Sequence, residues 1–87
     1  MAAARQFEFV HRDRPFVLEV DTAGTLALKL DGIVRKERPA QDDEPQYVWT
    51  NVELQWEEHH YIEARYWASS RRLEVTVNRE PLHDVRL

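Results

Sequence analysis

The side chains best suited to chemistry in this sequence are an adjacent histidine pair, His59 and His60, which directly follows two glutamates. Imidazole and carboxylate groups are ordinary ligands of zinc. Neighbouring side chains of a strand point to opposite faces, however, so His59 and His60 are not placed to share one ion. His11 or His83 would have to join one of them through the fold, and no spacing in the chain requires this. We therefore predict surface histidines, with no metal site and no cofactor.

The remaining reactive groups argue against catalysis. Paired carboxylates act as general acid and base when a cleft holds them at a fixed separation, whereas Asp42, Asp43 and Glu44 lie in a predicted loop. The chain has only two glycines, too few for a Gly-rich phosphate loop, and the serines Ser69 and Ser70 lack the surroundings of a nucleophile elbow. We expect no catalytic residue and no enzyme activity.

The stretch from Tyr47 to Trp67 concentrates the aromatic side chains. It contains all three tryptophans and all three tyrosines, and neither Gly nor Pro. Trp, Tyr and Arg are enriched where proteins bind partners tightly, and a contiguous exposed patch usually marks a contact. We predict that one face of this stretch binds a partner through Tyr47, Trp49, Tyr61, Arg65 and Trp67. The alternative is that this face points into a sandwich or is covered by the loop 38–46.

A second candidate set is basic and consists of Arg35, Lys36, Arg38, Arg71 and Arg72. Together with aromatic side chains that stack bases, it would suit single-stranded nucleic acid. Lys and Arg also protect exposed strand edges from aggregation, and we favour this second interpretation. The net charge of −4 and the interspersed charges argue against a general surface for nucleic acid or anionic membrane.

These observations predict a non-enzymatic protein-interaction module that binds a protein partner through the aromatic and Arg65 face. The alternative is a domain that binds a small ligand or single-stranded nucleic acid on the same face. The chain has no cysteine, and neither its start nor any later segment has the apolar run of a signal peptide or membrane span. We expect a cytoplasmic protein, either a monomer or a homodimer that pairs strand edges.

The positioning elements are short segments in which apolar and polar residues alternate with period two, as in half-buried strands. They predict a single all-β domain over 1–87, an antiparallel β-sandwich or small barrel of about seven to nine strands. Asp31-Gly32 is a strong hairpin signal, Gly24 lies in a short loop, and the segment 38–46 is a flexible acidic loop. The segments LKLDGIVR and VTVNREPL share a strand-turn-strand pattern, but a generic meander produces it too.

The register of the central hairpin is argued from which pairing keeps apolar residues on one face. A three-residue loop from Glu57 to His59 does so, whereas a two-residue turn mixes the faces. The expected pairs are Trp56 with His60, Leu54 with Ile62, Val52 with Ala64, and Thr50 with Tyr66. This register also places Trp49 beside Trp67.

Two blocks, LKLDGIVRKE and LEVTVNREPL, resemble the amino-terminal half of the Fas apoptotic inhibitory molecule family. The matching residues are Gly24, Asp31-Gly32 and Arg35-Lys36-Glu37, followed by Leu73-Glu74-Val75, Asn78 and Leu82. The chain departs from the family at Arg79, where the family has Gly, and at Arg38, where it has Trp. The resemblance implies a compact antiparallel β-sandwich without catalytic residues, which acts through protein contacts in cell survival or protection from aggregation.

Overall fold

All regular elements of the described chain are β-strands. The computed structural model describes residues 5–40, 42–55 and 58–87, and within them no helix is long and apolar enough to cross a membrane. The strands are β1 (Arg5–His11), β2 (Arg14–Val20), β3 (Leu26–Leu30), β4 (Ile33–Arg38), β5 (Gln46–Gln55), β6 (Glu58–Trp67), β7 (Arg72–Val77) and β8 (Glu80–Arg86).

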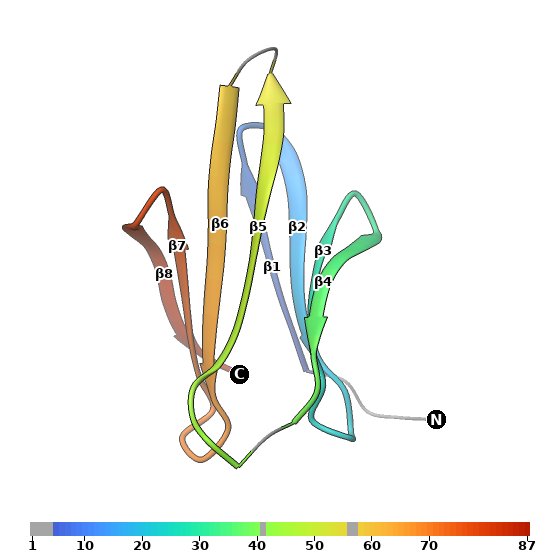
Figure 1. Cartoon of the computed structure of the whole chain (residues 1–87), viewed down its shortest axis with the longest axis vertical. Helices are drawn as coiled ribbons and strands as arrows, with labels where there is room; N and C mark the ends of the chain where they lie inside the picture. The colour runs from blue at the N-terminus through green and yellow to red at the C-terminus, as the bar shows by residue number, and fades with distance from the viewer. Residues whose placement is uncertain (1–4, 41, 56–57) are drawn as a thin grey trace.

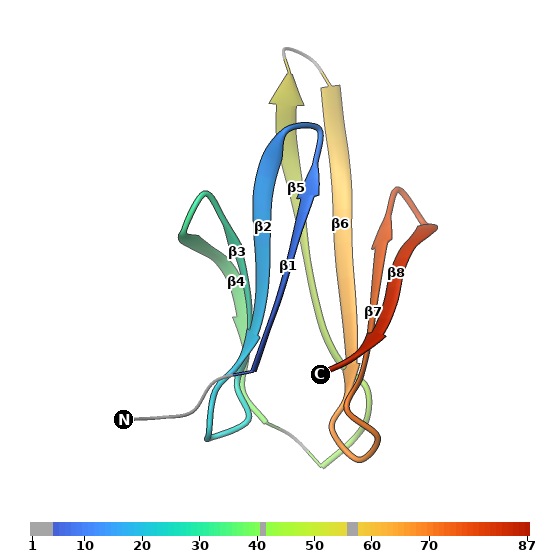
Figure 2. The ribbon, with the colours of Figure 1, turned by 180° about the vertical axis from the view of Figure 1, so that it is seen from behind.

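The strands form two four-stranded antiparallel sheets, ordered β1-β2-β3-β4 and β5-β6-β7-β8 (Figure 1). Each sheet is therefore a simple meander, and the chain passes from one sheet to the other between β4 and β5. Strands β5 and β6 lie in front of β1 and β2 in Figure 1 and behind them in Figure 2. In both views the hairpins β3–β4 and β7–β8 diverge to opposite sides. The prediction of an all-β antiparallel sandwich is confirmed.

The core lies between the two sheets and takes alternate residues from their strands. Its largest fully buried side chains are Phe16, Leu18, Leu26, Leu28, Ile62, Leu73 and Val75. Phe9 stacks on Phe16 with ring centroids 5.2 Å apart, and His83 of β8 packs against Phe7 and Phe9 of β1 at 5.0 and 5.3 Å. His83 therefore helps to join the sheets at their β1 and β8 edges.

The register expected for the central hairpin is wrong. The observed pairs are Gln46 with Tyr66, Val48 with Ala64, Thr50 with Ile62, and Val52 with His60. The shift is even, so the same side chains face the core in both registers, and hydrophobic patterning could not separate them. The observed register also places Trp49 opposite Glu63, which avoids the like-charge pair of Glu53 and Glu63 in the expected one. The turn, with Trp56 and Glu57, lies outside the described residues.

Three tight turns close hairpins with both central residues at positive φ: Arg12–Asp13, Asp31–Gly32 and Asn78–Arg79. This is the backbone of the type I′ turn, whose twist matches that of the flanking strands. The prediction of a hairpin at Asp31-Gly32 is confirmed, and Gly24 also has the positive φ expected of its loop, 88°. The turns Asp31–Gly32 and Asn78–Arg79 close the last hairpin of each sheet.

These last hairpins correspond in another respect. The pairing of β3 with β4 shifts between Leu28 and Lys29, and the pairing of β7 with β8 shifts between Val75 and Thr76. In both sheets the irregularity follows the middle of the third strand. The likeness of LKLDGIVR and VTVNREPL thus reflects equivalent places in two meanders of the same order.

The link between the sheets is anchored at both ends. The buried side chain of Gln46 donates from Nε2 to the carbonyl oxygen of Gly24 at 2.8 Å, and Arg38 Nε donates to the carbonyl oxygen of Tyr47 at 2.8 Å. Between them, Glu44 accepts from the amide and hydroxyl of Ser69 at 2.8 and 2.9 Å. The structure places Arg38 and Gln46 in strands, so the loop is shorter than the predicted segment 38–46.

Candidate functional site

The outer face of the β5–β8 sheet carries all five predicted partner-binding residues. Alternation along β5 and β6 buries Val48, Thr50, Ile62 and Ala64, and it turns the residues between them away from the core. Five side chains of the predicted binding set therefore come to one face: Tyr47 and Trp49 from β5, and Tyr61, Arg65 and Trp67 from β6. They differ in exposure and in the contacts they make.

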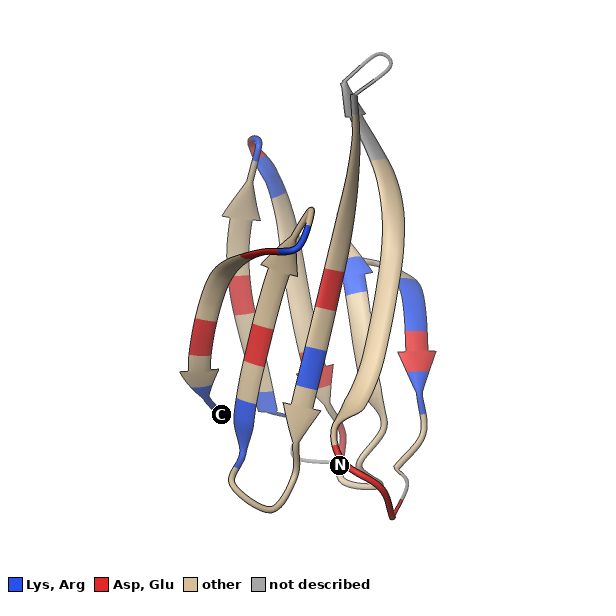
Figure 3. Cartoon of the chain, turned by 60° about the vertical axis from the view of Figure 1, so that its left-hand side comes forward, with Lys and Arg blue, Asp and Glu red and all other residues tan. Residues whose placement is uncertain are grey.

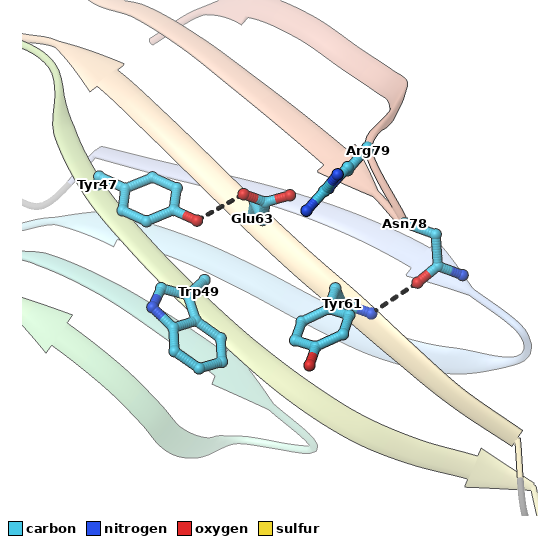
Figure 4. A pocket seen from close by; sticks show the side chains of 6 residues that line it. All are labelled: Tyr47, Trp49, Tyr61, Glu63, Asn78 and Arg79. Carbon is cyan, nitrogen blue, oxygen red and sulfur yellow. Dashed lines mark hydrogen bonds between the residues drawn. The ribbon is translucent and has the colours of Figure 1, made fainter.

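Trp49 and Tyr61 form the exposed part of this face. Their ring centroids are 5.9 Å apart with the planes tilted by 45°, and the residues are 44% and 49% exposed. Beside them lies an open hollow of about 490 Å³, lined by Tyr47, Trp49, Tyr61, Glu63, Asn78 and Arg79 (Figure 4). We call this feature the aromatic hollow.

Tyr47 forms a more enclosed wall of the aromatic hollow. Its hydroxyl donates a hydrogen bond to the carboxylate of Glu63, and the guanidinium of Arg65 lies 4.9 Å from its ring centroid (Figure 4). Burial raises the pKa of Tyr47 above its ordinary value, and the hydrogen bond to Glu63 raises it further. The ring and hydroxyl of Tyr47 are thus held in one orientation by two charged neighbours.

Asn78 and Arg79 reach the aromatic hollow from the turn between β7 and β8. The amide of Tyr61 donates to Oδ1 of Asn78 at 2.9 Å, and the amide of Asn78 donates to the carbonyl oxygen of Tyr61 at 2.9 Å. This two-way link fixes the turn beside Tyr61, while the side chain of Arg79 extends toward Glu63 (Figure 4). The hollow therefore combines aromatic surface with one carboxylate, one carboxamide and one guanidinium.

Trp67 lies away from the aromatic hollow. It is half-buried at the end of β6, and the guanidinium of Arg72 covers its ring at 4.8 Å from the centroid. Arg72 in turn pairs with Asp84 at 2.9 Å and with Glu74 at 3.5 Å. The hydrogen bond from Arg72 lowers the pKa of Asp84. Trp67 therefore belongs to a network of cations and acids rather than to the exposed pair.

The predicted basic set is divided between the sheets. Arg35, Lys36 and Arg38 lie on β4, where every residue is exposed, whereas Arg71 and Arg72 lie in and after the turn that precedes β7. Lys36 joins the two predicted sets, because its ammonium lies 5.7 Å from the ring centroid of Trp49. Basic and acidic bands both occur along β6, β7 and β8, as Figure 3 shows.

Sequence reasoning did not group Glu63, Asn78 and Arg79 with the aromatic residues, and it considered Arg79 as a site residue only beside the basic residues Arg71 and Arg72. Glu63 has the same strand parity as Tyr61, so its place on the outer face was readable from the alternation. Its contact with Tyr47 depends on the register of β5 with β6. Hydrophobic patterning could not fix this register, because registers that differ by an even number of residues bury the same side chains. The Asn78–Arg79 turn lies beside Tyr61 because β7 pairs with β6, and no pattern in the sequence indicates the register of that pairing.

The described residues contain no group of three or more His, Cys, Asp or Glu side chains placed to hold a metal ion. His59 is exposed and His60 is buried, so the two side chains point to opposite faces, and the prediction of a surface histidine is wrong for His60. Comparison with known proteins finds no match to this chain among family models, curated proteins or solved structures.

Proposed function

We propose that this domain is a non-enzymatic protein-interaction module that binds its partner at the aromatic hollow. The observation that carries the proposal is the exposed pair of Trp49 and Tyr61 beside an open hollow on a regular sheet. Large aromatic side chains bury much apolar area when a partner covers them, and they lose little conformational entropy because they have few rotatable bonds.

The neighbours of this pair favour binding because they are already fixed. Tyr47 is held by Glu63 and Arg65, and Tyr61 is flanked by the turn at Asn78. A site whose walls are ordered before binding loses less free energy on association than one that must be ordered by the partner. A partner side chain that enters the hollow would contact aromatic faces and could form hydrogen bonds with its polar rim.

The resemblance to the Fas apoptotic inhibitory molecule family implies the same class of function. The implied β-sandwich acts through protein contacts and has no catalytic residues. Of the predicted partner-binding residues, the proposal places Trp49 and Tyr61 at the centre of the contact and Tyr47 and Arg65 at its border. Trp67, covered by Arg72, lies outside it.

The experiment is quantitative binding with matched variants. Proteins that co-purify with the wild type in quantitative mass spectrometry are purified, and their Kd is measured by calorimetry against the wild type, Trp49→Ala and Tyr61→Ala. We expect each substitution to weaken binding by roughly 10-fold or more, as for central interface aromatics. The control is Val10→Ala, an apolar residue 68% exposed on the other sheet. Equal affinity of all four proteins would exclude the aromatic hollow as the interface.

A second candidate function is favoured by the volume of the hollow. About 490 Å³ lies within the range of small-ligand pockets, and Lys36 and Arg79 add positive charge beside stacking surfaces. This candidate predicts that short single-stranded oligonucleotides bind to the wild type but not to Trp49→Ala, with an affinity that falls steeply with salt. Absence of oligonucleotide binding at low salt would exclude the nucleic-acid form of this candidate.

A further inference from the structure

Two histidines from different sheets meet at the end of the sandwich where β1 ends and β6 begins. Nε2 of His11 lies 3.1 Å from Nδ1 of His60, and the ring centroids are 5.0 Å apart with the planes at 65°. His60 is 8% exposed and His11 is half-buried, so both imidazoles are partly withdrawn from water. His59, which faces the other way, is exposed.

The separation of these nitrogens is close to that of two imidazoles on one metal ion. Tetrahedral zinc binds histidine nitrogens at about 2.0–2.1 Å, which places two such nitrogens about 3.3 Å apart. The observed 3.1 Å therefore requires an adjustment of a few tenths of an ångström together with a tilt of the rings. Imidazole ligands suit Zn²⁺, Ni²⁺ and Cu²⁺, whereas Mg²⁺ prefers oxygen.

The space around the pair can admit an ion and its water ligands. His11 and His60 line an open hollow of about 440 Å³, together with Arg12, Val77, Asn78, Glu80, Pro81 and Leu82. Among the described residues that line it, Glu80 and Arg12 are charged. The carboxylate of Glu80 favours a bound cation, and the guanidinium of Arg12 opposes it.

We propose that His11 and His60 bind a divalent transition metal, Zn²⁺, Ni²⁺ or Cu²⁺, across the two sheets. Both facing nitrogens then coordinate through their lone pairs, so the imidazole that donates in the metal-free hydrogen bond moves its proton to its other ring nitrogen. Water fills the remaining positions, and Glu80 supplies negative charge nearby. With two imidazole ligands the site is open, so the metal is exchangeable. The site adjoins the aromatic hollow, because Asn78 lines both, but its imidazoles do not line the aromatic hollow and the proposal does not depend on the proposed function.

The test is thermal unfolding of the tag-free full chain with Zn²⁺, Ni²⁺, Cu²⁺ or Mg²⁺. A metal that binds only the folded state at ten times its Kd raises the Tm of a domain of this size by about 5–10 °C. We expect such a rise with at least one of the three transition metals and none with Mg²⁺. We expect His11→Gln and His60→Gln to abolish the rise, and Glu80→Gln to reduce it.

His59→Gln is the matched control, because it removes the neighbouring imidazole on the opposite face. It should keep the full metal response. Because His60→Gln changes a buried side chain, long-range ¹H–¹⁵N spectra of the wild-type imidazoles give an independent measure, in which metal should perturb His11 and His60 and leave His83 unchanged. If none of the three transition metals raised the Tm of the wild type, the contact of His11 with His60 would not be a metal site and the proposal would be overturned. A rise that persists in His11→Gln would overturn it as well.

Discussion

Trp49 on β5 and Tyr61 on β6 are diagonal neighbours, with ring centroids 5.9 Å apart. Directly across the ladder, Trp49 faces Glu63 and Tyr61 faces Asn51. Diagonal pairs on one sheet face are within reach of aromatic side chains, so the two rings can tilt toward each other while their edges stay open to solvent. The two outer-face tryptophans, Trp49 and Trp67, consequently occupy different surroundings.

The first prediction concerns the fluorescence of these two tryptophans in a Trp56→Phe background. With Trp67→Phe added, Trp49 alone reports, and we expect red-shifted emission that acrylamide quenches readily, because Trp49 is 44% exposed. With Trp49→Phe added instead, Trp67 reports, and quenching should be weaker because Arg72 covers its ring. Adding Arg72→Ala to the second protein should increase quenching of Trp67. Equal quenching of Trp49 and Trp67 would contradict the two environments.

Alternation of side chains was sufficient to predict the all-β sandwich and to group Tyr47, Trp49, Tyr61, Arg65 and Trp67 on one face, but it left open whether this face was the outer one. It could not predict which of these residues touch, because an even shift of register leaves both faces unchanged. Trp67 was expected beside Trp49 for this reason. A contact such as Tyr47 with Glu63 is set by the absolute register, which the turn decides.

The second prediction concerns the ionisation of Tyr47. Burial and the hydrogen bond to Glu63 raise its pKa, so Tyr47 should stay neutral above the ordinary tyrosine value. Glu63→Gln removes the carboxylate and should lower the pKa of Tyr47, because burial alone then raises this pKa while the charges of Arg65 and Arg79 lower it. The measurement is an alkaline titration of tyrosine absorbance, with Tyr47→Phe to assign the signal.

The control for this titration is Glu8→Gln, an exposed acid on the other sheet, which should leave the signal of Tyr47 unchanged. Because the pKa of Tyr47 is raised in the folded state, its contribution to stability is complete below the ordinary tyrosine pKa. That contribution is lost as pH rises through the folded pKa. An unchanged titration of Tyr47 in Glu63→Gln would show that the carboxylate does not act on the hydroxyl.

The third prediction concerns acid pH and the pair of Arg72 and Asp84. The hydrogen bond from Arg72 lowers the pKa of Asp84 in the folded state. The pair therefore stabilises the fold above the ordinary aspartate pKa, and this contribution disappears as pH falls through the lowered value. Asp84→Asn should be slightly less stable than the wild type at pH 7, and the difference should vanish near pH 2.

Urea unfolding at both pH values measures this difference, and the effect should be small because the pair is exposed and screened by salt. Asp42→Asn is the control, because Asp42 is an exposed acid in the loop that links the two sheets. Its stability difference from the wild type should not change between pH 7 and pH 2. A difference between wild type and Asp84→Asn that stays constant from pH 7 to pH 2 would rule out the ionic contribution.

Sites that join distant strands were the least predictable from sequence. The meeting of His11 with His60 depends on how the β1–β2 sheet packs on β6, and the two residues are 49 positions apart. The sequence showed that His59 and His60 face apart, and it identified His11 as one of two possible partners. Which one meets His60 is set by the packing of the two sheets, and His83 instead contacts Phe7 and Phe9.

The fourth prediction compares the equivalent turns Asp31–Gly32 and Asn78–Arg79. Gly32 and Arg79 occupy the second central position, with φ of 79° and 69°. A side chain in this region costs roughly 1–2 kcal/mol. Gly32→Ala should therefore destabilise by about 1 kcal/mol, although no atom lies within 4 Å of the added Cβ. Conversely, Arg79→Gly should stabilise the fold by up to about 1 kcal/mol. The relief of strain at positive φ favours Gly, and the larger conformational entropy of Gly in the unfolded chain partly offsets this gain.

Arg79→Ala separates the backbone effect from the loss of the Arg79 side chain, because Ala keeps the strained φ while removing the guanidinium. Chemical denaturation of Arg79→Ala and Arg79→Gly gives the difference, and Gly should be the more stable replacement. If Ala were the more stable of the two, the positive φ at Arg79 would carry no strain. Any effect of replacing Arg79 on stability would then come from the loss of its side-chain contacts at the aromatic hollow.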